Sequence, residues 1–409
     1  MSLGRRTFRS GIIFSFLMLW STGAKSCDSG VFKVSKPLWR LVCNNRKKVG
    51  LLSVLFLFFS AANAVDSVAD DIAEKKEATI TSHGFFGTCH RHILGYCKNI
   101  GIHVPFLPKY TFYKNDRYIS NGQIKTFNYK DVLLGLLPVA LWNTSLGQYH
   151  DIKTFAEECQ RLIVSGVEEI NIHGISRGAA SACNFVCIDK NTFEEKKKLR
   201  KIGEQGLYYR EFEKIRSHVK TAVLESPFDN AKQVFANHNL VKLFSKIITS
   251  EGFYNITQKF SRYKSGGMQP IECAENMAKE SKKIKSLIVC SLEDKLVTPD
   301  ATIRLAIKMK EKNPKNTYVL ILDRGKHGNL LNGPDGAKYC NVMHAFYKYA
   351  GVRHNKKFAE VGEKDFKECR KLNKRGLKKI LKNIEKRKKF AMREKDRKTS
   401  VIEVKKAKL

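Results

Sequence analysis

Short apolar segments with strand-like composition alternate with segments of helical periodicity along most of this 409-residue chain. The runs Thr221–Leu224, Ser286–Cys290 and Tyr318–Leu322 are mostly apolar without alternation, which is typical of strands buried on both faces. Residues 152–163 and 302–310 instead repeat apolar side chains at helical intervals. This alternation predicts an α/β fold built from βαβ units, with a mostly parallel sheet covered by helices on both faces.

The chain is strongly basic. It contains 75 Lys and Arg against 39 Asp and Glu, a formal net charge of +36 at pH 7. Residues 351–409 carry a large share of this excess, with 23 basic and 8 acidic residues and few apolar ones. We expect this segment to be a basic helical or disordered tail that binds an anionic membrane surface, or one that only adds solubility. No nucleic-acid-binding motif accompanies the charge, so no specific nucleic acid is expected as a partner.

The N-terminal segment 1–64 has the features of an export signal. Asn44–Lys48 is basic, Leu51–Ser60 is apolar, and Ala61–Ala64 ends in small residues as signal-peptidase sites do. Cleavage after Ala64 would leave Val65 as the new N-terminus. The apolar stretch is shorter than the roughly 20 residues that span a bilayer. The pattern therefore favours a secreted, periplasmic or envelope protein, with a membrane-anchored protein as the alternative.

A serine lies in a glycine-flanked turn, Gly174-Ile175-Ser176-Arg177-Gly178. The turn follows the strand predicted over residues 167–173 and precedes a helix of small residues over 179–188. Gly-x-Ser-x-Gly also occurs by chance, but a strand before it and a helix after it are the context in which the serine is a nucleophile. Gly174 and Gly178 would let the two backbones approach each other. Ser176 is therefore the candidate nucleophile.

A serine hydroxyl needs a general base. His327 follows the last predicted strand and is the best candidate, because a histidine there can reach over the carboxyl edge of the sheet. Weaker candidates are His83, His90, His150 and His173. The side chain of His173, just before the turn, should point away from the serine.

A carboxylate must hold the tautomer of that base. Asp294 follows the strand Ser286–Cys290 and gives the chain order Ser, Asp, His. Glu293 is the adjacent alternative, and Asp300 and Asp323 are less favoured.

When a serine attacks an acyl carbonyl group, the carbonyl oxygen becomes negatively charged. This oxyanion requires two N–H donors. The backbone N–H of Arg177 is one candidate. The N–H of Phe85, in the loop Ser82–Gly87 after an early strand, is the other. No metal ligands are expected, since the eleven cysteines contain no CxxC pair and no Cys/His ladder, and the proposed chemistry requires no cofactor.

Over residues 78–350 these motifs, in this order, resemble the α/β-hydrolase superfamily. The resemblance implies an eight-stranded, mostly parallel sheet with helices on both faces, and a helical cap of about residues 230–282 inserted after the strand that ends near Leu224. The Asp294 loop is similar to that of esterases and of dienelactone-hydrolase-like or prolyl-oligopeptidase-like enzymes.

The resulting hypothesis is a hydrolase domain over residues 65–350. It would cleave a small-molecule or lipid acyl ester through a Ser-Asp-His triad and a covalent acyl-enzyme, as esterases, lipases and thioesterases do. The alternatives are a serine peptidase, and a non-catalytic binding protein that uses the hydrolase fold and its basic surface.

Overall fold

The computed structural model describes residues 77–84, 123–127, 132–133, 137–138, 145–198, 208–237 and 249–406, all within the unit Ala69–Leu409. A six-stranded, fully parallel sheet forms its centre, in the order β2-β1-β5-β6-β7-β8. These strands are β1 (Glu77–Ser82), β2 (Gln123–Phe127), β5 (Glu169–Ile175), β6 (Val219–Glu225), β7 (Lys285–Ser291) and β8 (Thr317–Leu322). A separate antiparallel pair joins β3 (Val132–Leu133) to β4 (Leu137–Pro138).

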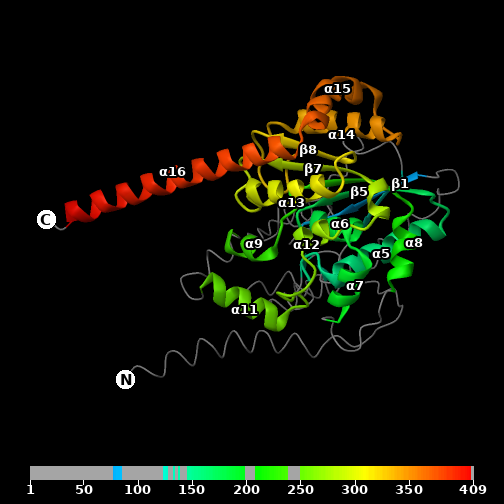
Figure 1. Cartoon of the computed structure of the whole chain (residues 1–409), viewed down its shortest axis with the longest axis horizontal. Coiled ribbons are helices and arrows are strands. Elements are labelled where there is room, and N and C mark those ends of the chain that lie inside the picture. The colour runs from blue at the N-terminus through cyan, green and yellow to red at the C-terminus, as the bar shows by residue number, and fades with distance from the viewer. Residues whose placement is uncertain are drawn as a thin grey trace, which may run out of the picture. The chain divides into compact units, whose positions relative to one another are not determined.

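Helices cover both faces of the sheet in two layers (Figure 1). On one face lie α5 (Tyr149–Val164), α6 (Arg177–Cys187), α8 (Tyr209–Arg216), α12 (Pro270–Glu275), α13 (Pro299–Lys312) and the first turns of α16 (Lys374–Lys406). On the other face lie α14 (Gly336–Ala350) and α15 (Lys356–Lys371). The remaining described helices are α7 (Lys190–Lys197), α9 (Ala231–Asn237), α11 (Ser250–Phe260) and the short 3-10 helix Glu280–Lys283.

The strands are apolar on both sides because both sides are covered. In β7, Leu287 and Val289 pack under α14, whereas Ile288 and Cys290 face the α6 and α13 layer. All four side chains are at most 1% exposed. The continuously apolar strands expected from the sequence are thus confirmed, and so is the mostly parallel sheet with helices on both faces. The expected total of eight strands stays a prediction, because residues 85–122, between β1 and β2, lie outside the described residues.

The segment expected to form a cap contributes to two different parts of the structure. Between β6 and β7, helices α9 and α11 build a small apolar cluster that includes Phe228, Tyr254 and Tyr263. Helix α12 instead packs on α6 and α13, and its Cys273 belongs to the main core. The described residues between Ala231 and Tyr263 therefore contribute to an apolar cluster distinct from the two sheet-facing clusters, and Ala180 of α6 and Ala301 of α13 also belong to it.

The segment expected to be a tail also begins as part of the folded domain. Helix α15 packs on α14 so closely that a Cβ at Gly362 would overlap the carbonyl of Asn341. Phe366 and Leu377 are buried in the two sheet-facing clusters. The low apolar content of residues 351–409 hides this packing, because the few apolar side chains are concentrated on one face of each helix. No described helix is both long and apolar enough to cross a membrane.

Candidate active site

The sheet order places a topological switch point between β1 and β5, because the chain moves outward from β1 to β2 and then returns to the other side of β1. Open α/β sheets bind their ligands at the carboxyl ends of the strands at such a point. Ser82, the last residue of β1, pairs in register with Gly174 of β5. The loop after β1 and the serine turn after β5 therefore meet at this switch point.

Ser176 occupies the turn between β5 and α6 in a strained conformation, with φ 54° and ψ −112°. A non-glycine residue with positive φ costs free energy and persists only where its surroundings fix it, often at functional sites. Here the Ser176 N–H donates to the carbonyl of Glu225 at the end of β6 (2.8 Å), and Ala180 N–H donates to the Ser176 carbonyl (2.9 Å). The serine is 3% exposed.

The two flanking glycines are required by close backbone contacts. A Cβ on Gly174 would overlap the backbone of Gly178, and a Cβ on Gly178 would overlap the Ser82 carbonyl. The structure thus places Gly174 against the first turn of α6 and Gly178 against the end of β1. It also brings the loop after β1 against the serine, because a Cβ on Gly84 would lie 3.3 Å from the Ser176 Cβ.

The predicted base and acid are in direct contact. His327 Nδ1 lies 2.7 Å from Asp294 Oδ2, with the side chains 12% and 1% exposed. The other carboxylate oxygen of Asp294 accepts the N–H groups of Leu296 and Val297, both at 3.0 Å. These two bonds hold the carboxylate in place independently of its contact with His327. With Nδ1–H donating to Asp294, the acceptor of a neutral His327 ring is Nε2, as a general base requires.

The neighbouring carboxylate has a different role. Glu293 Oε2 accepts the Gly325 N–H (3.2 Å), and Asp335 accepts the Arg324 N–H (2.8 Å). Glu225 accepts the Leu330 N–H at 3.4 Å. The loop that carries the histidine is therefore held on both sides by carboxylates. Of the acids that the sequence left open, Asp294 contacts His327, whereas Asp300 binds Arg304 and Lys388.

The alternative histidines lie in other environments. His173 is buried in β5 on the α14 side, with Nε2 3.1 Å from the Tyr339 hydroxyl, so it points away from the serine turn as expected. His150 Nδ1 lies 2.8 Å from Arg262 Nη1. His83 is next to the serine loop, but burial lowers its pKa to about 4 and keeps the ring neutral near pH 7. His90 lies outside the described residues.

Of the two predicted oxyanion donors, Arg177 is the first residue of α6, where backbone N–H groups have no partner within the helix. The positive end of the helix dipole also lies there. Phe85 lies outside the described residues, one position beyond Gly84. Within the described part of the chain, no group of three or more His, Cys, Asp or Glu side chains could hold a metal ion.

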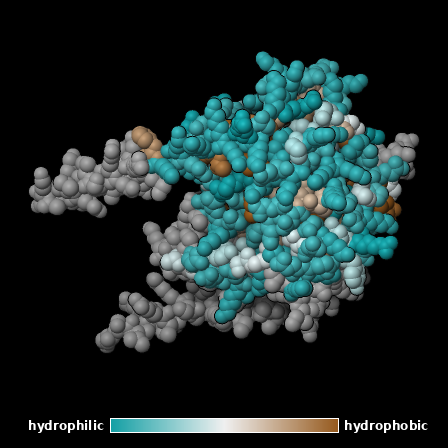
Figure 2. Space-filling model, viewed as in Figure 1, coloured by the Kyte–Doolittle hydropathy of each residue, from teal (hydrophilic) through white to brown (hydrophobic). Residues whose placement is uncertain are grey.

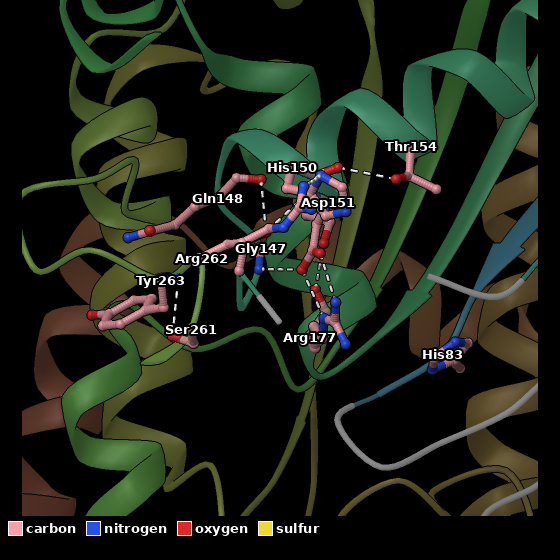
Figure 3. Close-up of polar contacts among 12 residues, drawn as sticks. His83, Gly147, Gln148, His150, Asp151, Thr154, Arg177, Ser261, Arg262 and Tyr263 are labelled. Atoms are coloured by element: carbon pink, nitrogen blue, oxygen red, sulfur yellow. Dashed lines mark hydrogen bonds and ion pairs between the residues drawn. The ribbon is translucent and has the colours of Figure 1, made fainter. Parts of the chain in front are cut away.

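A buried ion pair that the sequence analysis does not predict lies behind the serine. The Arg177 guanidinium donates to both oxygens of Asp151 on α5, through Nε (2.7 Å) and Nη2 (2.6 Å). The two side chains are 1% and 0% exposed. Figure 3 shows Arg177 pointing toward Asp151. An arginine in a turn followed by small buried residues signals that its charge needs a partner. Arg177 and Asp151 are 26 positions apart in the sequence, so the sequence does not reveal which acid is the partner.

No protein-family model matches the chain, and no curated protein matches it. Several solved structures are similar in fold. One is an esterase from Pyrococcus furiosus, 14% identical, with 68% of this chain and 84% of the esterase covered and a TM-score of 0.41. Another is an acylaminoacyl peptidase from Pyrococcus horikoshii, 16% identical, with 69% of this chain but only 38% of the peptidase covered and a TM-score of 0.42.

A third is an alpha/beta hydrolase from a Medee basin deep-sea metagenome library, 15% identical, with 66% of this chain and 89% of that chain covered and a TM-score of 0.38. Likenesses this distant indicate neither a reaction nor a substrate for this chain. The fold of this chain is identified from its own features. These are the strand order, the strained serine turn after β5, and the two loops after β7 and β8. The chain has the fold of the α/β-hydrolase superfamily.

Proposed function

We propose that the protein is a serine hydrolase that cleaves an acyl ester through Ser176, His327 and Asp294. The observation that carries the proposal is the 2.7 Å contact between His327 Nδ1 and a buried, otherwise fully bonded Asp294. It occurs at the same sheet edge as a serine in the strained strand-to-helix turn. A carboxylate bonded to Nδ1–H leaves Nε2 of the histidine free of hydrogen, which allows Nε2 to accept a proton from the serine.

In the proposed reaction, His327 Nε2 accepts the hydroxyl proton as Ser176 Oγ forms a bond to the ester carbonyl carbon. The N–H groups of Arg177 and Phe85 donate to the resulting oxyanion. The C–O bond to the leaving group breaks, and the alcohol departs with the proton held by His327. Water then attacks the acyl-enzyme with His327 again accepting a proton, which releases the acid and restores the serine.

Active-site labelling tests this proposal. The full chain should hydrolyse short-chain p-nitrophenyl esters and react covalently with a fluorophosphonate. Ser176→Ala should abolish labelling and lower kcat on the order of 10⁶-fold. Ser281→Ala is a control, since it removes a buried hydroxyl from the 3-10 helix Glu280–Lys283 and not from the serine turn. Labelling that persists in Ser176→Ala would refute the assignment.

Two alternatives remain distinguishable by experiment. A serine peptidase would use the same three residues, and digestion of a peptide library would reveal cleavage that a pure esterase lacks. A non-catalytic binding protein on this fold would show neither labelling nor turnover in the unaltered chain. The ordered Asp294–His327 contact supports an enzyme, because a protein that only binds has no need for an oriented base.

We further propose that α16 brings the enzyme to an anionic membrane surface. Leu377, Ile380, Leu381 and Ile384 pack toward the core. Six basic residues lie on the opposite side of the helix and are exposed, namely Arg375, Lys378, Lys379, Lys382, Lys386 and Lys389. They extend over about 21 Å of helix axis. Hydrophilic residues also cover most of the described surface in the view of Figure 2.

A further inference from the structure

We propose that Asp151 is a positioning residue that fixes Arg177, and with it the oxyanion-binding N–H beside the serine. This inference rests on the proposed function and concerns how the same site is held in place. Arg177 is both the residue after the nucleophile and the first residue of α6. A change in the position of its side chain would therefore be transmitted directly to the backbone N–H that meets the oxyanion.

Asp151 is held by three hydrogen bonds, which occupy both carboxylate oxygens. Oδ2 accepts from Gly147 N (2.7 Å) and Arg177 Nε (2.7 Å), and Oδ1 accepts from Arg177 Nη2 (2.6 Å). The two parallel bonds to the guanidinium form a bidentate pair, which fixes direction as well as distance. Burial opposes ionisation, but the charge of Arg177 outweighs it and lowers the pKa of Asp151. The pair is therefore ionic near neutral pH.

A second bond holds the same loop on α6. Asn184 Nδ2 donates to the Gly147 carbonyl (2.8 Å), so Gly147 is bonded through its carbonyl to α6 and through its N–H to Asp151. Gly147 has φ +89°, and a Cβ there would lie 3.1 Å from Ala180 Cβ. The loop before α5 and the first turns of α6 thus form one tightly packed unit around the ion pair.

The unit extends to the segment between β6 and β7. Gln148 Nε2 donates to the Lys264 carbonyl (2.7 Å), and Lys264 N–H donates to Gln148 Oε1 (2.8 Å). Next to it, His150 Nδ1 lies 2.8 Å from Arg262 Nη1. Figure 3 shows His150 and Asp151 of α5 beside Arg262 and Arg177. A segment that follows α11 is therefore connected to the serine turn through Gln148 and Asp151.

The direction of the expected effect separates positioning from simple electrostatics. Asp151 neutralises Arg177, so removing its charge would leave a cation next to the developing oxyanion. If only charge mattered, Asp151→Asn would leave kcat unchanged or raise it. If the pair holds the N–H in place, the same variant loses part of its transition-state stabilisation and becomes slower.

We expect Asp151→Asn to lower kcat by about 10- to 100-fold on a p-nitrophenyl ester, because displacing catalytic groups by about 1 Å can have such effects. KM should change by no more than about twofold, since the oxyanion contact forms only in the transition state. The fluorophosphonate labelling rate should fall in parallel. An unchanged or increased kcat in the folded variant would overturn the inference.

Loss of folding is addressed by two further variants. Asp300→Asn also removes a largely buried carboxylate with two cationic partners, but one that binds Arg304 and Lys388 and not the serine turn. It should keep its kcat. The double variant Asp151→Leu/Arg177→Met replaces the buried ion pair by apolar side chains, a change that often preserves stability. It should remain slow although folded, and wild-type kcat in this variant would also overturn the inference.

The inference and the proposed function fail in different ways. If the unaltered chain neither labels nor turns over an ester, the proposed function fails. If the unaltered chain is active and folded Asp151→Asn is equally active, only the positioning role fails.

Discussion

At the scale of single residues, Asp294 and Glu293 are adjacent carboxylates with different partners. Asp294 contacts the imidazole of His327, and Glu293 accepts a backbone N–H from Gly325. Asp294→Asn should lower kcat by about 10³- to 10⁴-fold, because an amide no longer holds the required tautomer. Glu293→Gln retains an acceptor for Gly325 and should stay within about tenfold of the unaltered enzyme. Steady-state kinetics of the two isosteric variants provide the test, and equal losses would contradict these roles.

His83 gives a prediction about stability. Its ordinary pKa of 6.5 falls to about 4 in the fold, chiefly because burial disfavours the charged ring. The unfolded chain therefore binds the proton first as pH decreases. The contribution of neutral His83 to the free energy of unfolding is fully present above pH 6.5. It is lost as pH falls from 6.5 to 4, and the loss is at most about 3 kcal/mol.

In urea unfolding at a series of pH values, His83→Asn should lose less stability than the unaltered protein over this range. His218→Asn, at a half-buried histidine whose Nδ1 lies 3.0 Å from the Glu168 carbonyl, serves as the control. Identical pH profiles for His83→Asn and the unaltered chain would show that this histidine is not the source of the loss.

The sequence predicted Ser176, Asp294 and His327 because each follows a strand that its own residues define. Local pattern and chain order are sufficient for such residues. Asp151 could not be found this way, since its role depends on how α5 packs against α6. The sequence favours Asp294 over Glu293, but it does not exclude Glu293, because one position along a loop changes the direction of a side chain in a way that composition does not record.

At the scale of elements, periodicity located the central strands and the helices around them within a few residues. The expected helix 302–310, for example, lies within α13, Pro299–Lys312. The segment 351–409 is less well predicted. The sequence indicates a tail, but α15 and the first turns of α16 pack against the domain. Their sequences are dominated by exposed charge, and a buried stripe of one residue in three or four contributes little to composition.

Helix α16 carries the prediction for membrane binding. The full chain should bind phosphatidylserine-containing vesicles and not neutral ones, with about 1 kcal/mol from each basic residue near the surface. The binding should weaken steeply as salt shortens the Debye length. Changing Arg375, Lys378, Lys382 and Lys386 to Gln should abolish it in a vesicle sedimentation assay.

The control changes the same amount of charge on α15, with Lys356, Lys357, Lys364 and Lys367 replaced by Gln. All four are exposed. Equal losses in both variants would mean that net charge, and not the α16 face, is responsible. Binding to duplex DNA without binding to vesicles would contradict the choice of partner.

At the scale of the whole molecule, two features bear on the location of the protein in the cell. They are the net charge of +36 and the pattern of residues 44–64. Residues 44–64 lie outside the described residues, and their sequence has the pattern of an export signal. A basic segment, a short apolar segment and a final Ala-x-Ala are the three parts that signal peptidase and the export machinery recognise. We propose on this basis that the protein is exported and that its exported form begins at Val65.

Expression of the full chain in a bacterial host tests this proposal. N-terminal sequencing of the exported protein should begin at Val65, and Leu55→Arg should retain the chain in the cytosol because a charge disrupts the apolar segment. Lys75→Gln is a control, since it changes a charge beyond the expected cleavage site. A cytosolic protein with an intact Met1 would refute export. An uncleaved chain in the membrane fraction would instead indicate that residues 51–60 act as an anchor, and the cleavage at Ala64 would be wrong.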